Sequence, residues 1–542
     1  MIQKINGDLA FAYAARDAGV KIAVSYPGSP SSGTMDVLIE LAENDDIHVQ
    51  WSANEKVAME VGIGASIAGR RALVCTKSVG MNLMLDPLMA LNLTPVNAGL
   101  VILLGDDPGG YGSQNDQDTR SLAPMLEMPM MEPATPAEAY AMMREAFSLS
   151  ERLNTAVIIR ETRSFAQQVG RVDTADKPKT VHLGFTREPY RYVPVPLNVV
   201  EKHRFLHEQL ERFGEWADKS PFNHVSGSGT RGVIGAGFVY QKLLDVTGKE
   251  PTADFRVLKL GVLFPLPEET VARFLSDCDE VLVVEETEPF VETHIKAIAH
   301  DHGCKTKIYG KRSKHISREG ELFRWQIHEA LSRFLPGFVP DRRYTRENEI
   351  RERPEMQSYC GGCRYDEVLD VLDEAAAALQ QKIVLVGDPG CLVTVADKLE
   401  AKYAIGSAVG VADGMSKAGI EERPVAVFGD SSFFHTSLPA ICNAVYDRSD
   451  ILMVVLDNSA TRTSGFQPHP GVGRDALGKE TPKLSIEKIA HACGVPFIRN
   501  VALEPKSNLK DNFQEALSQD KLALLVVRLP RVQRTKLTKH TG

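Results

Sequence analysis

The sequence is poor in cysteine, and this shortage excludes several kinds of protein. Eight cysteines in 542 residues are too few for a disulfide-stabilised scaffold. Cys360 and Cys363 form one C-x-x-C, and the others are scattered. The cysteine run of a bacterial-type iron–sulfur site is therefore absent. A tetrahedral zinc site would need a second close Cys or His pair, and none is obvious.

Long apolar runs and excess positive charge are also missing. The longest apolar pieces, such as Leu100–Leu104 and Ile451–Leu456, fall far short of the ~18–20 residues of a spanning helix. Lys4, Asp8 and Arg16 interrupt the N-terminus, which does not resemble a signal peptide. A net charge of −9 provides no field for nucleic acid or anionic lipid. We expect a cytoplasmic protein without a membrane span or a nucleic-acid partner.

What is present is an ordinary globular composition with alternating strand and helix patterns. The hydrophobic share is 43% and the charged share 25%, and a chain of this length should form several domains. Alternating β and α elements predict an α/β fold with doubly wound parallel sheets. The strands we expect are 21–25, 72–76, 99–104, 156–160, 231–234, 257–260, 280–284, 382–386, 424–428, 450–456 and 523–528. The helices we expect are 54–68, 136–152, 199–215, 405–417, 438–446 and 485–493.

Composition shifts divide the chain into blocks. Residues 171–229 are polar and dotted with proline, and 342–354 are highly charged. We expect α/β domains at 1–175, 230–340 and 356–542, a linker with a helical insert at 176–229, and a linker at 341–355.

Two predicted strands of the last block end in polar residues that suit a metal ion. One ends in Gly429-Asp430, and 28 positions later the next ends in Asp457-Asn458. Ligands bind at the carboxyl ends of strands in open α/β sheets, and Mg²⁺ prefers carboxylate and amide oxygens shared with phosphate. A helix starting near Ser437 could direct N–H groups at a diphosphate. On these residues alone, an ordinary turn and an Asn cap remain an alternative.

This spacing resembles the thiamine-diphosphate (ThDP) motif, Gly-Asp-Gly followed some 25–30 residues later by Asn-Asn. The resemblance implies that Asp430, Asn458 and the carbonyl of Ala460 hold Mg²⁺. Ser431 replaces the usual glycine, and Asp457 replaces the first asparagine.

Further stretches, in the same order, are similar to the large (alpha) subunit of the indolepyruvate:ferredoxin oxidoreductase family, to about residue 500. They are 26–32, 51–58, 113–118, 260–261, 264–267, 284–286, 359–363, 387–391, 429–435 and 465–471. The resemblance implies a pyrimidine-binding ThDP domain at 1–175, a transketolase C-terminal-like domain at 230–340, and a diphosphate-binding ThDP domain at 356–542. It implies cofactor contacts from Cys360, Gly361, Gly362, Cys363, Gly387, Gly390, Cys391, Gly429, Asp430, Ser431, Ser432 and Asn458.

ThDP chemistry needs a carboxylate that hydrogen-bonds the aminopyrimidine N1′. Glu55 matches the family glutamate, and Glu60 is the alternative. Glu55 could also be a glutamate favoured at a helix N-terminus by the helix dipole. Because Glu55 and Asp430 lie in different blocks, one cofactor would have to bridge them. In this fold class the two blocks usually belong to different subunits, so a dimer is expected.

Substrate contacts follow from the same resemblance. Ser29 matches a hydroxyl near the substrate carboxylate, with an ordinary Pro-Gly-Ser-Pro turn as the alternative. His435 and His469 could bind or protonate intermediates or could be structural. Arg462 departs from an apolar family pattern, so it either favours a substrate with an additional acidic group or faces solvent. Phe433, Phe434 and Phe466 suggest an aromatic or branched substrate, with core packing as the alternative.

We therefore expect ThDP- and Mg²⁺-dependent oxidative decarboxylation of 2-oxo acids, with aromatic acids such as indolepyruvate favoured. Acyl-CoA would form with a smaller partner subunit and an external electron acceptor. Family subunits normally continue into a ferredoxin-like domain, whereas no cysteine follows Cys493 here. We thus expect no intrinsic iron–sulfur cluster in this chain. The alternatives are a non-oxidative ThDP-dependent decarboxylase or lyase and a non-catalytic subunit of the same fold.

Overall fold

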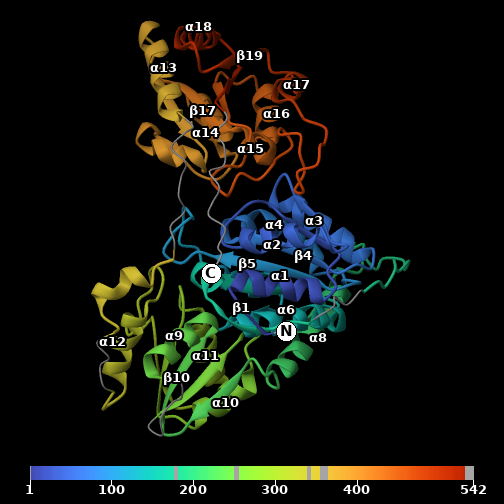
Figure 1. The fold of residues 1–542 in the computed structure, drawn as a ribbon, viewed down its shortest axis with the longest axis vertical. Coiled ribbons are helices and arrows are strands. Elements are labelled where there is room, and N and C mark those ends of the chain that lie inside the picture. Colours follow the sequence, from blue (N-terminus) through green and yellow to red (C-terminus); the bar gives the residue numbers. More distant parts are fainter. Residues whose placement is uncertain (1, 176–180, 249–254, 339–342, 355–363, 531–542) are drawn as a thin grey trace. The chain divides into compact units, whose positions relative to one another are not determined.

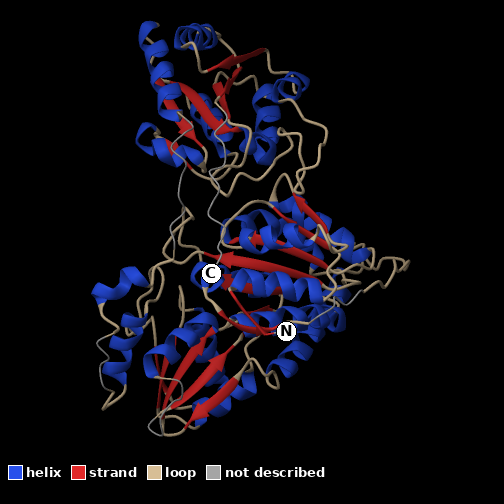
Figure 2. Ribbon diagram, in the orientation of Figure 1, coloured by secondary structure: helices blue, strands red, loops and turns tan. Residues whose placement is uncertain are grey.

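The computed structural model describes residues 2–175, 181–248, 255–338, 343–354 and 364–530. The chain forms two compact units, which we describe separately. Unit 1 comprises residues 1–50 and 55–356, and unit 2 comprises residues 51–54 and 357–542. Figures 1 and 2 show that each unit is built of sheets lined by helices. None of the helices in the described ranges is both long and apolar enough to cross a membrane.

The first part of unit 1 is a seven-stranded sheet of order β12-β6-β7-β5-β4-β2-β3. Strand residues of even number, such as Val74, Leu100 and Ile102, share one core with Met59 and Met81 of the covering helices. This follows from the period of two along a strand. The elements are β1 (Ile2–Ile5), α1 (Gly7–Asp17), β2 (Ile22–Ser25), α2 (Ser32–Leu41), β3 (His48–Trp51), α3 (Glu55–Ile67), β4 (Ala72–Lys77), α4 (Ser78–Leu91), β5 (Leu100–Asp106), η1 (Thr119–Ser121), α5 (Leu122–Leu126), β6 (Met130–Met131), α6 (Pro136–Leu153), β7 (Val157–Thr162), α7 (Arg163–Gln167) and β8 (Gly170–Asp173). Strands β1 and β8 pair antiparallel in a small separate sheet.

The second part of unit 1 is a five-stranded sheet of order β14-β13-β10-β11-β9, parallel except for β9. The short strand β12 leaves this part and pairs antiparallel with β6 of the first sheet. Leu258 and Val283 belong to the same core as the first sheet, so the two parts fold as one unit. The elements are α8 (Val199–Ala217), β9 (His224–Gly227), β10 (Arg231–Ala236), α9 (Gly237–Thr247), β11 (Arg256–Leu260), β12 (Val262–Phe264), α10 (Glu268–Ser276), β13 (Glu280–Val284), α11 (Phe290–Asp301), β14 (Lys307–Tyr309), α12 (Arg324–Phe334) and η2 (Arg346–Arg351).

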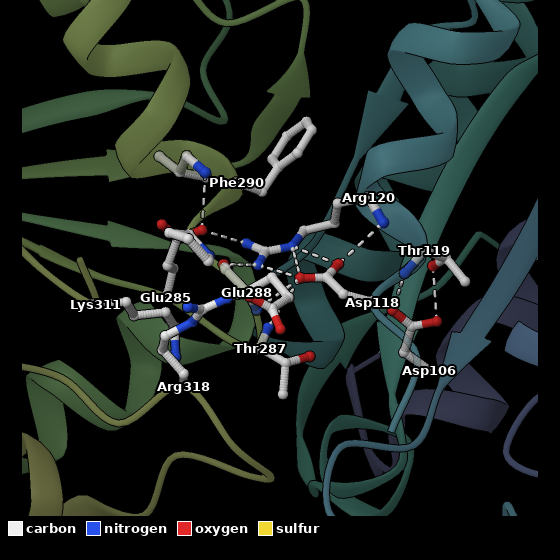
Figure 3. Close-up of polar contacts among 12 residues, drawn as sticks. Asp106, Asp118, Thr119, Arg120, Glu285, Thr287, Glu288, Phe290, Lys311 and Arg318 are labelled. Carbon is white, nitrogen blue, oxygen red and sulfur yellow. Dashed lines mark hydrogen bonds and ion pairs between the residues drawn. The ribbon is translucent and has the colours of Figure 1, made fainter. Parts of the chain in front are cut away.

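A buried ionic cluster also connects the two parts of unit 1 (Figure 3). Arg120 pairs with Asp118 beside it, at 2.6 Å, and with Glu285 at the end of β13, at 2.8 Å. Its guanidinium also donates to the carbonyl of Glu288 at 2.8 Å and lies over the ring of Phe290. Burial alone would raise the pKa of Asp118, but the charge of Arg120 holds it well below its usual value. Two stretches that resemble the family, 113–118 and 284–286, therefore meet at this joint.

Unit 2 is a six-stranded, all-parallel sheet of order β16-β15-β17-β18-β20-β19. Val425 and Val427 face one core with α13 and α18, while Ala426 and Phe428 face the other with α14 and α16. Strands buried on both faces explain the continuous apolar runs of the sequence. The elements are α13 (Tyr365–Ala378), β15 (Ile383–Gly387), η3 (Cys391–Lys398), β16 (Ala401–Lys402), α14 (Ser407–Lys417), β17 (Arg423–Gly429), α15 (Asp430–Ser432), η4 (Phe433–Ser437), α16 (Leu438–Tyr446), β18 (Leu452–Asp457), α17 (Ile486–Ala492), β19 (Phe497–Ala502), α18 (Lys506–Leu517) and β20 (Ala523–Arg528).

The parallel α/β prediction is confirmed, and every strand and helix expected from the sequence is present within two residues of its predicted ends. The sequence did not predict β12, whose three residues extend a sheet formed more than a hundred positions earlier. Such a short strand has no alternation of its own, and only the partner strand defines it.

Candidate functional site

The carboxyl edge of the unit 2 sheet brings together the two halves of the predicted metal motif. In the parallel register of β17 and β18, Gly429 lies opposite Leu456. The residues that follow each strand, Asp430 and Asn458, are therefore at the same edge, and they are 2% and 4% exposed. Buried polar residues at this edge match the usual ligand position in an open α/β sheet.

Asp430 is held by hydrogen bonds on both carboxylate oxygens. Oδ1 accepts from the backbone N–H of Ser431 at 2.9 Å, and Oδ2 accepts from that of Ser459 at 2.7 Å. His469 lies 3.2 Å from Oδ2 through Nε2. Because the N–H of Gly471 donates to Nδ1 of the same ring at 3.2 Å, Nε2 carries the proton that points to Asp430. The aspartate is oriented but has no lysine or arginine as an ion-pair partner in the described part of the chain.

The last residue of β18, Asp457, and the residue after it, Asn458, complete an oxygen-rich cluster. Asp457 pairs with Arg528 at 2.7 Å, yet burial and the neighbouring Asp430, with which it shares a hydrogen bond, raise its pKa. The amide of Asn458 donates to the hydroxyl of Tyr365 at 2.8 Å, which fixes the side-chain orientation. Two close buried carboxylates and an amide fit a divalent cation, because the cation would offset their repulsion and use hard oxygen donors.

Neighbouring loops leave room beside this cluster. A Cβ added to Gly429 would meet nothing within 4 Å, and one added to Gly390 would approach only Thr463, at 3.8 Å. Gly390 also has φ +106, which strongly favours glycine. The carboxylate of Asp388 accepts two N–H groups at the start of α14, at 2.7 and 2.9 Å, and burial raises its pKa to about 6. This anchored loop and its open glycines fit the space that a diphosphate needs.

The remaining loop positions predicted at the cofactor have different surroundings. Gly387 ends β15, where an added Cβ would lie 2.5 Å from Leu399, so close packing already requires glycine there. Cys391 is partly buried at the start of η3. The predicted contacts at Cys360, Gly361, Gly362 and Cys363 lie outside the described residues.

The segment after Asp430 contains a short π-helical turn, Phe433–Ser437, a feature that recurs at functional sites. The hydroxyl of Ser431 contacts that of Thr461 at 3.1 Å, and Ser432 hydrogen-bonds the carboxylate of Asp388. His435 is 8% exposed, and its Nδ1 lies 3.1 Å from the hydroxyl of Thr436. Phe433 and Phe434 pack in the core, which favours the core-packing interpretation of these two residues.

Arg462 lines a cavity of about 240 Å³ beside the metal motif. The side chain is 6% exposed, so the alternative that it faces solvent is wrong. Its guanidinium donates to the carbonyl of Asn458 at 2.7 Å, which ties it directly to the motif. Three cationic side chains line the cavity, which suits an anionic group. The lining residues are Asn458, Ser459, Ala460, Arg462, Phe466, Val472, Arg474 and Lys483.

Unit 1 has its own polar cluster at the carboxyl edge of its first sheet. Glu55 begins α3 and is 6% exposed. A Cβ added to Gly80 in α4 would lie 2.6 Å from its Oε1, so the glycine leaves room for the carboxylate. Burial lowers the pKa of Lys77, at the end of β4, although the charges of Asp107 and Glu55 counteract this. Glu60, the alternative catalytic glutamate, is half-exposed and pairs with Lys56, so Glu55 is the better placed of the two.

Ser29 lies in the loop between β2 and α2 and is partly buried. The loop packs against Lys77, because a Cβ added to Gly28 would lie 2.7 Å from the lysine side chain. Ser29 is thus close in the fold to the edge that carries Glu55. No role was predicted from the sequence for Lys77, Gly80, Asp388 or Tyr365, although Asp388 lies in the family-like stretch 387–391. Lys77 could have been found from its position directly after an apolar strand, whereas the roles of the others depend on contacts between distant segments.

Comparisons with known proteins agree with this geometry. Residues 13–196 match the model "Pyruvate flavodoxin/ferredoxin oxidoreductase, thiamine diP-bdg", residues 241–332 match "Indolepyruvate oxidoreductase domain", and residues 401–527 match "Thiamine pyrophosphate enzyme, C-terminal TPP binding domain". The fold and the two clusters therefore define a ThDP-dependent 2-oxoacid oxidoreductase.

Individual relatives narrow the assignment. The indolepyruvate oxidoreductase subunit IorA of Pyrococcus abyssi is 33% identical over 96% of this chain and 84% of its own length. IorA of Methanothermobacter marburgensis is 34% identical over 97% of this chain and 86% of its own length. The 2-oxoglutarate synthase subunit KorA of Archaeoglobus fulgidus is 26% identical over 52% of this chain and 88% of its own length. The chain belongs to the IorA family, the alpha subunits of indolepyruvate oxidoreductase.

Proposed function

We propose that this chain is the ThDP- and Mg²⁺-binding subunit of an enzyme that oxidatively decarboxylates aromatic 2-oxo acids such as indolepyruvate. The observation that carries the proposal is the cluster of Asp430, Asp457 and Asn458 at one edge of the unit 2 sheet. These buried oxygen donors suit a cation that would be shared with a diphosphate. The aromatic acid is inferred from the name of the IorA relatives, indolepyruvate oxidoreductase.

At the diphosphate end, Asp430, Asn458 and the carbonyl of Ala460 would hold Mg²⁺. His469 positions Asp430 through its Nε2 proton, so we assign it a positioning role rather than direct proton transfer to the substrate. His435, held against Thr436, remains our candidate for contact with the reacting group. We propose that residues 356–542 form the diphosphate-binding domain, with cofactor contacts from residues 360–363 as well.

At the aminopyrimidine end, Glu55 would hold a proton between its carboxylate and the ring N1′. When bound, ThDP would supply a nucleophilic C2 carbon and an electron sink for the bond pair released on decarboxylation. Burial of Glu55 beside Gly80 excludes water from this hydrogen bond and thereby strengthens it. We propose that residues 1–175 are the pyrimidine-binding domain and that 230–340 form the middle domain.

We propose that cationic side chains at the carboxyl edges of the unit 1 and unit 2 sheets bind the anionic groups of the substrate. We propose that Ser29 contacts the 2-oxo acid carboxylate and that Lys77, beside its loop, offsets the negative charge. Arg462, in its cationic cavity, would accept a second anionic group of the substrate or of CoA. We further propose a smaller partner subunit, acyl-CoA as product, an external electron acceptor and a cytoplasmic location.

Two substitutions test the roles proposed for Glu55 and Asp430 separately. Glu55→Gln should abolish 2-oxo acid-dependent reduction of a viologen dye, measured with the partner subunit and CoA, and leave Mg²⁺–ThDP binding detectable by calorimetry. Asp430→Asn should weaken that binding itself. Glu60→Gln is the matched control, since this exposed glutamate lies on the same helix, α3, at a later position. Full activity of Glu55→Gln would refute the cofactor assignment, and aldehyde release without dye reduction would favour a non-oxidative decarboxylase.

A dimer can be tested with the same two variants. If one copy supplies Glu55 and a second copy supplies Asp430 to each cofactor, mixing inactive Glu55→Gln and Asp430→Asn proteins should restore up to about a quarter to a half of the activity, depending on how subunits exchange. A mixture as inactive as its components, after proven subunit exchange, would contradict the shared site.

A further inference from the structure

Three side chains on the surface of unit 1 point their ligand atoms at one another. His203 and His207 stand on α8, which Figure 1 labels, and Glu127 follows the short helix α5. Nε2 of His203 lies 2.8 Å from one oxygen of Glu127, and Nε2 of His207 lies 2.7 Å from the other. The ligand atoms of all three lie within 4.8 Å of one another.

The helix itself brings the two imidazoles together. Residues four apart share one face of an α-helix, and the two ring centroids are 4.3 Å apart. Leu206 and Phe213, on the neighbouring face of the helix, are buried, which anchors the helix against unit 1. Two imidazoles on one helical turn are a recurring half of a zinc site.

The carboxylate is supplied by a residue in an unusual backbone conformation. Glu127 has φ 53 and ψ 41, the left-handed region in which glycine is the usual residue at a helix end. A side chain is strained there relative to glycine. This conformation directs the carboxylate, only 26% exposed, toward histidines that are 46% and 53% exposed. A partly fixed carboxylate and two solvent-accessible imidazoles let an ion enter from solution.

We propose that His203, His207 and Glu127 form a binding site for a divalent borderline metal ion such as zinc, which fastens α8 to the end of α5. Two imidazole nitrogens and one carboxylate oxygen suit zinc better than Mg²⁺, which prefers oxygen ligands alone. Zinc would need its ligands ~3.4 Å apart, as follows from bond lengths of ~2.1 Å in tetrahedral geometry. The two nitrogen–oxygen distances of 2.8 and 2.7 Å would therefore lengthen by ~0.6–0.7 Å, and water would complete the coordination. The sequence contains this H-x-x-x-H pair, although no zinc site was predicted from it, and the third ligand lies 76 positions before the first histidine.

The experiment compares zinc binding by the full chain and three variants. Each protein is free of any affinity tag, is alkylated at its thiols and contains saturating Mg²⁺ and ThDP, so that other metal ligands are blocked. Isothermal titration with zinc chloride should show one more bound ion per chain for the wild type than for His203→Ala. The control is His302→Ala, because His302 also contacts a carboxylate, that of Glu268, at 3.0 Å, but without a second histidine. It should bind as many ions as the wild type.

Glu127→Gly keeps the test independent of misfolding. Glycine relieves the left-handed backbone, so the metal-free variant should have a thermal midpoint equal to or above that of the wild type. Zinc should raise the midpoint of the wild type and of His302→Ala, because ligands that bind only the folded state stabilise it, and it should leave Glu127→Gly and His203→Ala unchanged. Equal stoichiometry in the wild type and His203→Ala would show a hydrogen-bonded clamp without metal and overturn the proposal. A zinc-dependent rise that persists in Glu127→Gly would do the same.

Discussion

Replacing Arg120 by methionine should destabilise unit 1 more than any surface substitution. The Arg120 side chain is 1% exposed, and its partners Asp118 and Glu285 are 3% and 0% exposed. Methionine retains most of the apolar stem but leaves two buried carboxylates without their cation. Breaking a buried ion pair by removing one partner costs about 3–5 kcal/mol. Both carboxylates keep backbone N–H donors, so we expect the lower half of that range.

Urea unfolding followed by tryptophan fluorescence measures this loss. Trp216 and Trp325, two of the three tryptophans, belong to unit 1. Arg318→Ala is the matched control, because Arg318 pairs with Glu288 on the surface, where both side chains are about half exposed. An exposed pair is worth about 0–1 kcal/mol. The reasoning would be refuted if Arg120→Met cost no more than Arg318→Ala.

A second substitution tests the cause. If the loss reflects an unpaired buried charge, adding Glu285→Gln to Arg120→Met should recover part of the stability, because a neutral amide is cheaper to bury than a carboxylate. Further destabilisation by the second change would instead mean that Glu285 contributes through its backbone contacts at the start of α11.

Three other expectations can be measured on the same protein. Gly80→Ala should displace Glu55 and lower activity at least tenfold. The control is Gly64→Ala in α3, where an added Cβ meets nothing within 4 Å; it should stabilise the protein by up to about 1 kcal/mol and leave activity unchanged. Equal activities of the two variants would contradict the contact between Gly80 and Glu55. His469→Ala should weaken Mg²⁺ binding in the presence of ThDP by about 10–100-fold, measured by calorimetry, and an unchanged affinity would remove its positioning role. Burial lowers the pKa of Lys311 to about 8. Between pH 8 and ~10.5 this lysine is therefore protonated in the unfolded chain but largely neutral in the folded one. The free energy of unfolding should rise with pH in that window by up to about 3 kcal/mol. Lys311→Met should flatten this rise in urea midpoints, and a parallel rise in both proteins would show that other groups cause it.

The sequence predicted the strands and helices well, because each depends on the pattern of neighbouring residues. Apolar runs of five or six residues fixed the buried parallel strands. The position of Asp430 and Asn458 after two such runs then predicted that they share an edge. The contacts that orient them come from elsewhere: Tyr365 holds Asn458 from α13, and His469 reaches Asp430 from a loop. No sequence spacing predicts such partners, because the loops and helices between two contacting segments can have any length.

The same limit explains why the sequence assigned no role to two stretches that resemble the family. Residues 113–118 and 284–286 lie far apart in the sequence, and each could be assigned only by analogy. In the structure Asp118 and Glu285 have a common partner, Arg120 (Figure 3), and the cluster joins the two sheets of unit 1. Similarity to relatives therefore marks joints between sheets as well as catalytic groups, and the two differ in what their loss does. Arg120→Met should lower the stability of unit 1 while the folded protein retains its affinity for ThDP. Glu55→Gln should instead abolish activity and leave the stability of unit 1 unchanged.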